Sequence, residues 1–333
     1  MIGIKIYPTD ICFHYRHFNV RWPEQVYGDN DYLYFSSEPL PDWYITELEK
    51  HGVNYEVPPA MLPWQIWYRY LLLKYPELKE IVFINDTSAK RHQRNRYLAK
   101  KCITTTWGIL SWSVSELYGY DDHFFDNLDY EKYLIFEPWQ ETHLKAHGNY
   151  GECMLVQHPG LTHARNHKNG SGNGKTITFF DNTFGGKSPI SQQYHRQWLV
   201  DILKLLDENP GLKIQYKIKN PTFDWQCVTR QEQFLRNRII IDKRIKELYQ
   251  QLRDHPRCHL MYRLYESVFE AIAESDCVIS EPFTSTTTDA VNLGIPAHYY
   301  DPTGRFSDPS LRLHGLTITG FDALQDRIRG FPD

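Results

Sequence analysis

The 333-residue sequence lacks features that would place it in several common functional classes. The apolar run WYRYLLLKYP is far too short to cross a bilayer, and the first residues, MIGIKIYPTD, turn polar too early for a secretory signal. The six cysteines show no paired spacing, and a net charge of −4 gives no basic field to attract nucleic acid. We therefore expect a cytoplasmic protein with free thiols and no nucleic-acid partner.

Metal-binding motifs are also missing. There is no HExxH sequence and no spaced pair of aspartates, since Asp121 and Asp122 are adjacent. His143 and His147 have helical spacing, but the histidines that follow them lie near a polar, glycine-rich stretch. The sequence therefore predicts neither a metal site nor a bound cofactor.

What the sequence does contain is a regular alternation of strand-like and helix-like segments, which predicts parallel sheets covered by helices on both faces. A polar break from Thr162 to Lys175 has no apolar periodicity. It divides the chain into two predicted α/β domains, residues 1–165 and 177–333, joined by a linker at 166–176. Two such Rossmann-like domains would face a ligand cleft at the carboxyl ends of their strands.

A run of hydroxyl residues in the second half, within SEPFTSTTTDAVNLGIP, precedes a short predicted helix that ends at Gly294 and Pro296. The first N–H groups of a helix lack acceptors and carry partial positive charge, so hydroxyls placed there favour a phosphate. A plain helix cap is the alternative, but it needs only one hydroxyl. The run therefore predicts a phosphate site formed by Thr284, Ser285, Thr286 and Thr287.

Carboxylates and lysines follow the predicted strands. Asp181 ends the strand TITFFD, and Gly185 in the loop after it lets the backbone approach a ligand. Asp181 is a candidate nucleophile or general base, with the capping of a turn as the alternative. Asp86 is a second candidate, and its alternative is to cap the next helix. Lys217 and Lys219 alternate along one strand, so both are predicted to face the cleft and to supply phosphate-binding charge.

A basic segment follows Asp86 and contains no acidic residue. It is either a solvated helix face or a landing surface for an anionic acceptor or the inner face of an anionic membrane. The residues predicted to make that contact are Lys90, Arg91, Arg94 and Lys101.

The order of these motifs resembles that of GT-B glycosyltransferases of bacterial surface-polysaccharide assembly. TSTTTDAVNLGIP followed by HYYD resembles their nucleotide-binding part, and EIVFINDTSAKRHQRNRYLAKKCITTTWG their Asn-Asp strand and basic helix. Many members have His-Gly where this chain has Trp107-Gly108, so that histidine's role is not carried over. The resemblance implies a GT-B-like fold, a nucleotide-sugar donor whose ribose or sugar hydroxyls Glu281 binds, and a bacterial glycan acceptor.

Within that group, TITFFDNTFGG and the Lys-x-Lys strand resemble transferases that use CMP-Kdo to add β-linked Kdo, as in lipopolysaccharide or capsule synthesis. CDP-glycerol-type phosphotransferases and sugar-nucleotide epimerases share much of the same pattern. A member of another class, an inactive module that binds nucleotide or glycan, is also compatible with it.

Overall fold

The computed structural model describes two compact units, one formed by residues up to 161 and one by residues from 175 onwards. The described residues are 1–6, 20–28, 30–36, 39–40, 42–59, 62–84, 96–98, 100–101, 104–108, 128, 130–136, 138–157, 161, 175–182, 184, 188–219, 242–261, 268–282, 284–306 and 314–330. Because residues 162–174 lie outside this set, the linker predicted at 166–176 stays a prediction.

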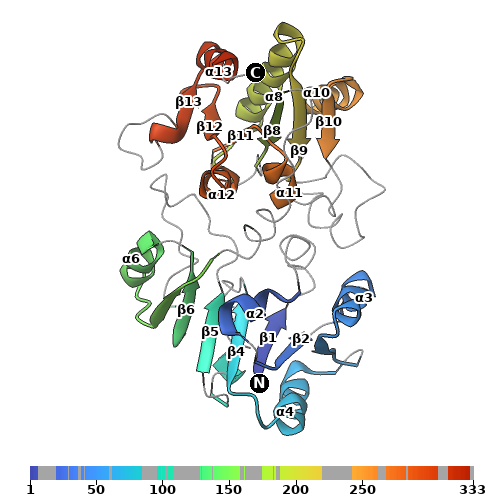
Figure 1. Cartoon of the computed structure of the whole chain (residues 1–333), viewed down its shortest axis with the longest axis vertical. Helices are drawn as coiled ribbons and strands as arrows, with labels where there is room; N and C mark the ends of the chain where they lie inside the picture. The colour runs from blue at the N-terminus through green and yellow to red at the C-terminus, as the bar shows by residue number, and fades with distance from the viewer. Residues whose placement is uncertain are drawn as a thin grey trace. The chain divides into compact units, whose positions relative to one another are not determined.

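The N-terminal unit is built on a seven-stranded sheet in the order β3-β2-β1-β4-β5-β6-β7 (Figure 1). Every described pairing in it is parallel. The strands are β1 (Ile2–Ile6), β2 (Tyr32–Ser36), β3 (Asn54–Glu56), β4 (Glu80–Ile84), β5 (Thr104–Gly108), β6 (Lys132–Ile135) and β7 (Glu152–Leu155).

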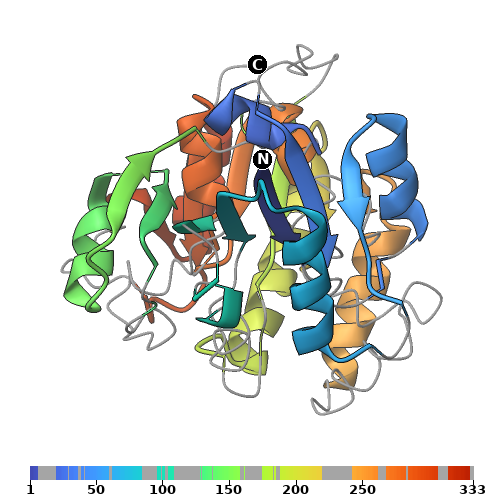
Figure 2. The ribbon, with the colours of Figure 1, turned by 90° about the horizontal axis from the view of Figure 1, so that it is seen from below.

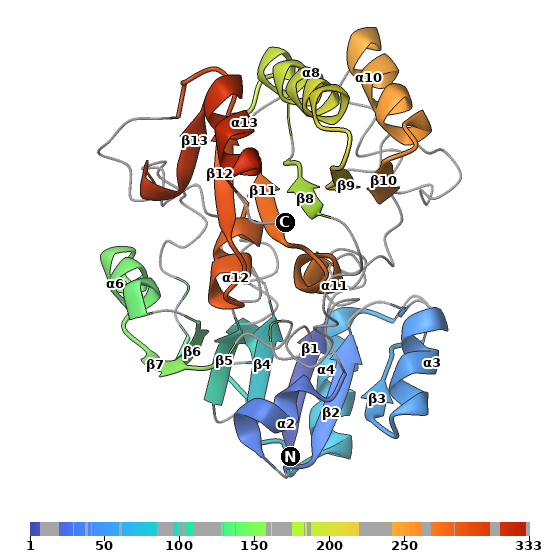
Figure 3. The same ribbon diagram turned by 45° about the horizontal axis from the view of Figure 1, so that its top comes forward.

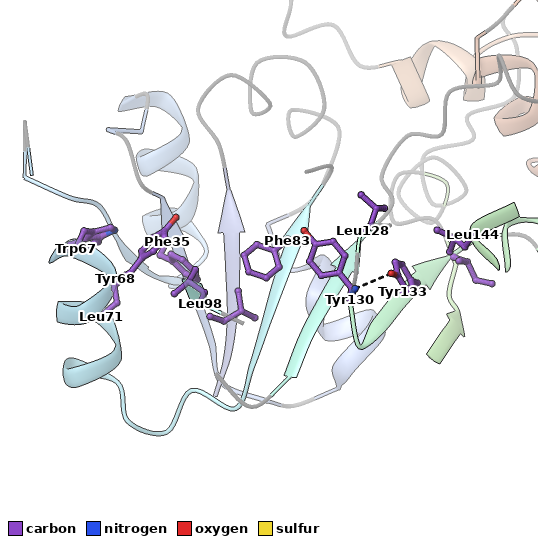
Figure 4. Packing of buried hydrophobic residues seen from close by; sticks show 12 residues of the cluster. Phe35, Trp67, Tyr68, Leu71, Phe83, Leu98, Leu128, Tyr130, Tyr133 and Leu144 are labelled. Atoms are coloured by element: carbon purple, nitrogen blue, oxygen red, sulfur yellow. Dashed lines mark hydrogen bonds between the residues drawn. The ribbon is translucent and has the colours of Figure 1, made fainter. Parts of the chain in front are cut away.

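One face of this sheet is covered by an aromatic core. The described helices of the unit are α2 (Trp22–Tyr27), α3 (Asp42–Lys50), α4 (Trp64–Lys74) and α6 (Pro138–Ala146). Helix α4 packs Trp67, Tyr68 and Leu71 against the sheet, and α6 adds Leu144 to the same cluster (Figure 4). Burying such aromatic rings contributes more to stability than any polar contact in this unit. Among the described residues, no helix combines the length and apolar character needed to cross a bilayer.

The C-terminal unit repeats the arrangement with a six-stranded sheet in the order β10-β9-β8-β11-β12-β13 (Figure 3). Its described pairings are all parallel as well. The strands are β8 (Thr176–Phe180), β9 (Lys213–Lys217), β10 (Cys258–Met261), β11 (Cys277–Ser280), β12 (Ala297–Asp301) and β13 (Thr317–Thr319).

Helices cover both faces of the second sheet. On one face α8 (Gln192–Glu208) packs beside α10 (Lys243–Asp254) and contacts α13 (Phe321–Arg329), where the Lys204 ammonium lies 3.9 Å from the Phe321 ring centre. On the other face α11 (Val268–Ala273) and α12 (Thr286–Asn292) share a small apolar cluster with β11. The prediction of an α/β chain with two Rossmann-like domains is thereby confirmed.

Strand order determines where this unit can bind a ligand. Counted from β8, the order is 3-2-1-4-5-6, and it reverses between β8 and β11. At such a reversal the connections leave in opposite directions and open a crevice at the carboxyl ends of the two strands. Residues that directly follow β8 and β11 therefore have the position expected of a binding site.

Gly151 offers a test of core packing in the N-terminal unit. A β-carbon at this position would lie 2.3 Å from the Tyr130 carbonyl oxygen and 2.7 Å from the Tyr133 ring. We expect Gly151→Ala to lower the free energy of unfolding by about 1–3 kcal/mol, because backbone atoms cannot yield as a flexible side chain can. Urea unfolding measures this loss, and Gly211→Ala, with open space around its β-carbon position, serves as the control. Equal stability of both variants would contradict the packing described here.

Candidate functional site

Two buried carboxylates follow the strands that flank the reversal of strand order. Asp181 comes directly after β8 and is 3% exposed, and Glu281 comes directly after β11 and is 0% exposed. Burying a carboxylate is costly unless donors compensate it. The surroundings of these two acids therefore show how this edge of the sheet is constructed.

Asp181 is held through both oxygens. Its Oδ1 accepts the backbone N–H of Lys219, at the end of the neighbouring strand β9. Its Oδ2 accepts the hydroxyl of Tyr249 at 2.6 Å and, less closely, that of Tyr216 at 3.4 Å. The carboxylate thus connects the ends of β8 and β9 to helix α10, which carries Tyr249.

Glu281 connects to the same helices through a histidine. Its Oε1 lies 2.8 Å from Nδ1 of His195, a residue of α8 that is 0% exposed. Its Oε2 accepts the backbone N–H of Asn182 at 2.7 Å. Nε2 of His195 lies 2.7 Å from the Tyr249 hydroxyl. The result is a continuous chain from Glu281 through His195 and Tyr249 to Asp181, which we call the buried relay.

Protons in the relay are interdependent, because Tyr249 has only one to donate. If Tyr249 donates to Asp181, its contact with His195 requires a proton on Nε2; if Asp181 carries a proton, Tyr249 can donate to Nε2 instead. The heavy-atom contacts are the same in both arrangements, so the direction of the Tyr249 hydrogen bond depends on the protonation of Asp181.

Burial raises the pKa of Asp181 to about 6. The opposing contributions are the charge of His195 and the hydrogen bonds from Tyr249 and Lys219, while the charge of Glu281 adds to the rise. The same desolvation raises the pKa of the Tyr249 and Tyr216 hydroxyls well above their usual value. Both tyrosines therefore act as neutral donors.

His195 and Tyr249 were not among the residues predicted from the sequence. His195 lies three residues before Trp198 and seven before Ile202, so it falls on the apolar stripe that buries α8. Tyr249 lies four residues after Ile245 and three before Leu252, on the buried stripe of α10. A histidine and a tyrosine on such stripes indicate buried polar groups that need partners, but the spacing does not identify the partners.

The predicted phosphate-binding run lies at the beginning of α12, and most of its hydroxyls bond within the protein. Thr284 contacts the carbonyl oxygen of Glu281 at 3.2 Å and Oγ1 of Thr286 at 3.0 Å. Thr287 is buried and donates to the His298 carbonyl at 3.3 Å. Ser285 differs, because its side chain stands at the N-cap position without a capping hydrogen bond. The threonines fasten α12 to β11 and β12, which leaves Ser285 as the candidate contact for a ligand.

The two predicted lysines differ in their surroundings. Lys217 is the buried last residue of β9, whereas Lys219 is an exposed residue beyond the end of the strand. The Lys219 ammonium donates to Oδ1 of Asn182 at 2.8 Å, and Asn182 in turn donates to the Pro282 carbonyl at 2.9 Å. Although Lys219 is exposed overall, desolvation of its ammonium lowers the pKa of that group. The negative charges of Asp181 and Glu281 act in the opposite direction and raise it. Asn182 thus joins Lys219 to the segment that precedes α12.

Several sequence predictions lie outside the described residues. They concern Asp86, Gly185, Lys90, Arg91 and Arg94. Of the basic segment, Lys101 is described and exposed. In the described part of the chain no group of three His, Cys, Asp or Glu side chains could hold a metal ion, and Cys153, Cys258 and Cys277 are free thiols.

Comparison with protein families gives a match over well over half of the chain. The model of the family described as "Polysaccharide biosynthesis PFTS motif protein" matches residues 115–328. The letters P-F-T-S are those of Pro282, Phe283, Thr284 and Ser285, the segment between the buried Glu281 and helix α12. No curated protein sequence matches the chain.

Solved structures similar to this one include sugar-nucleotide epimerases. A putative UDP-N-acetylglucosamine 2-epimerase from Listeria monocytogenes has a TM-score of 0.62 and 9% identity, over 99% of this chain and 87% of that one. MnaA of S. aureus with UDP has a TM-score of 0.59 and 12% identity, over 98% of this chain and 87% of that one. The UDP-GlcNAc 2-epimerase of Neisseria meningitidis bound to UDP-GlcNAc has a TM-score of 0.57 and 9% identity, over 98% of this chain and 90% of that one. At these identities the likeness shows the fold, two Rossmann-like domains of the GT-B-like class.

The raised pKa of Asp181 predicts how stability depends on pH. An unfolded aspartate titrates near pH 4, so the folded state retains a proton that the unfolded chain has lost, and this contribution disappears as the pH rises through about 6. Asp181→Asn resembles the protonated acid and does not titrate. Between about pH 4 and about pH 7, the wild type should lose about 2 kcal/mol of unfolding free energy relative to this variant.

Urea unfolding at a series of pH values measures this difference. Asp254→Asn, at an exposed position of α10, is the control and should show a difference from wild type that is nearly independent of pH. A flat difference for Asp181→Asn as well would contradict the buried, proton-sharing environment of Asp181.

Proposed function

Because the chain belongs to the polysaccharide biosynthesis PFTS motif family, we propose that it is a glycosyltransferase that moves a sugar from a nucleotide-activated donor to a bacterial glycan. The nucleotide binds in the C-terminal unit, at the carboxyl ends of β8 and β11. The acceptor is a growing glycan, either free or carried on a lipid.

The observation that carries this proposal is the position of the PFTS segment. Its residues directly follow Glu281 at the end of β11, where the strand order of the sheet reverses. This is the place where open α/β sheets bind ligands. Pro282 accepts a hydrogen bond from the Asn182 side chain, and Glu281 before it belongs to the buried relay. Groups held in this way are preorganised, so little of the binding energy is lost in ordering them.

Donor phosphates would be bound by groups that the protein leaves accessible at this edge. Ser285 offers a hydroxyl that does not cap its own helix, and Lys219 offers an ammonium beside Asn182. A lysine placed against the leaving phosphate supplies positive charge while negative charge develops on the phosphate. A metal ion has this role in other transferases. The buried relay keeps both groups in place.

The catalytic role predicted for Asp181 remains a proposal, and its contacts fit a positioning role better. A nucleophile or base must reach the substrate, yet Asp181 is 3% exposed and both its oxygens accept hydrogen bonds from the protein. Glu281 is 0% exposed, so direct contact with a donor ribose requires the segment to move. Asp86, beyond the described residues, remains the other candidate for a reactive carboxylate.

The identity of the donor is the finer part of the proposal. A CMP-activated acidic sugar such as CMP-Kdo is the first candidate, on the resemblance of the Phe-Phe-Asp loop and the Lys-x-Lys strand. A sugar-nucleotide epimerase is the second candidate function, favoured by the UDP-GlcNAc 2-epimerases among the similar structures. A CDP-glycerol-type transferase is a further alternative.

Nucleotide release distinguishes these activities. We expect free nucleotide to form only when a CMP-sugar, a UDP-sugar or CDP-glycerol is supplied together with a glycan acceptor, as measured by ion-exchange chromatography. An epimerase would instead convert UDP-GlcNAc to its C2 epimer, visible by NMR, without any acceptor. Nucleotide binding without either reaction would indicate a binding module and contradict the proposed activity.

Variants at the accessible groups test the site itself. Ser285→Ala should weaken binding of the free nucleotide by about 1 kcal/mol, and Lys219→Met by about 1.5–3 kcal/mol, because a charged donor contributes more than a neutral one. Calorimetric titration with CMP, CDP and UDP gives the affinities. Thr288→Ala, whose hydroxyl contacts the Ser285 carbonyl, and Lys246→Met on the exposed side of α10 are matched controls. Unchanged affinity in both site variants would move the phosphate site elsewhere.

A further inference from the structure

Helix α4 of the N-terminal unit is apolar on its outer side as well as its inner side. The outer side carries Ile66, Tyr70 and Leu73, which are 54%, 46% and 82% exposed. Their spacing of four and three residues places them in one stripe along the helix. The outer side of a helix in a globular unit is normally polar. The Tyr70 ring stacks on Trp67 with ring centres 5.5 Å apart, but packing within the described residues does not account for Ile66 and Leu73, which are more than half exposed. Figures 1 and 2 show α4 as an outer helix of the unit.

Positive charge borders the stripe. Arg69 and Lys74 lie on the same side of α4, and both are exposed. Lys74 pairs with Glu56, and its ammonium also lies 5.6 Å from the centre of the Tyr70 ring. From residue 57 to residue 76 the sequence contains no aspartate or glutamate.

The basic segment identified in the sequence adjoins this side of α4. Nε of Arg69 donates to the Tyr97 hydroxyl at 3.1 Å, and the Tyr97 ring lies edge-on to Trp64 at 5.6 Å. Lys100 and Lys101 follow within four residues of Tyr97, and both are exposed. No acidic residue occurs between positions 87 and 115. Arg69 thus links the apolar stripe to a segment whose lysines follow Tyr97 within one helical turn, although the chain as a whole is acidic.

We infer that the outer side of α4, together with Lys100 and Lys101, binds an anionic lipid surface. Ile66, Tyr70 and Leu73 enter the boundary between headgroups and acyl chains, and Arg69, Lys100 and Lys101 pair with lipid phosphates. A bilayer provides hydrocarbon and negative charge together, which matches both parts of the surface. A second copy of the chain fits less well, because the same cations would face one another across the contact.

The inference is independent of the donor site, because it concerns binding without nucleotide. It would bring the chain to the membrane where a lipid-linked acceptor resides.

Cosedimentation of the full chain with lipid vesicles provides the test. The chain should bind vesicles of phosphatidylcholine mixed with phosphatidylglycerol, bind less as salt is added, and not bind phosphatidylcholine alone. Leu73→Ser should reduce binding about tenfold by removing apolar surface, and Arg69→Ala about fivefold by removing one cation. Val200→Ser and Lys246→Ala, at exposed positions of α8 and α10, are matched controls that should bind like the wild type.

Three results would overturn the inference. Wild-type binding by both α4 variants would show that another surface makes the contact. Equal binding to uncharged vesicles would remove the role of the cations. Self-association abolished by Leu73→Ser, in a chain that binds no vesicles, would assign the stripe to a second copy. Thermal unfolding of each variant verifies that it is folded. Since no donor is present, none of these results bears on the proposed transferase activity.

Discussion

Two carboxylates buried side by side would repel each other, and the C-terminal unit is arranged to prevent this. Asp181 and Glu281 follow the neighbouring strands β8 and β11, and His195 with Tyr249 joins them into one hydrogen-bonded chain. These two partners come from α8 and α10, so the relay fixes two helices to the sheet edge as well as compensating the charges. The loops that follow β8, β9 and β11 depend on it for their positions, because Asn182 links all three.

The hydroxyl run that begins within the PFTS segment has a different role in this structure from the one that its composition indicates. A series of hydroxyls before a helix is typical of anion binding, yet Thr284, Thr286 and Thr287 bond to strand ends and to one another. The hydroxyl run therefore joins α12 to β11 and β12. Ser285 is the member of this run for which the geometry supports a ligand contact.

Much of the fold could be predicted because its signals are local. The short helix predicted after the hydroxyl run is α12, and it ends before Gly294, whose φ of 73° suits glycine. Strand β3 has only three residues at a sheet edge, which is too short for a periodic signal. The site was only partly predictable, since position after a strand singles out Asp181 and Glu281. The pairing of His195 with Glu281 joins residues 86 positions apart, and no local pattern encodes such a pairing.

Asp301 is the last residue of β12, much as Asp181 directly follows β8. Both oxygens of its carboxylate also accept hydrogen bonds from the protein. Its carboxylate accepts backbone N–H groups from Thr303, Gly304 and Phe306, and it is 0% exposed. The acids at the ends of β8, β11 and β12 are therefore all held by hydrogen bonds within the C-terminal unit. Because these acids bind loops and helices to the strand ends, replacing any one of them would displace a neighbouring segment as well as remove a charge.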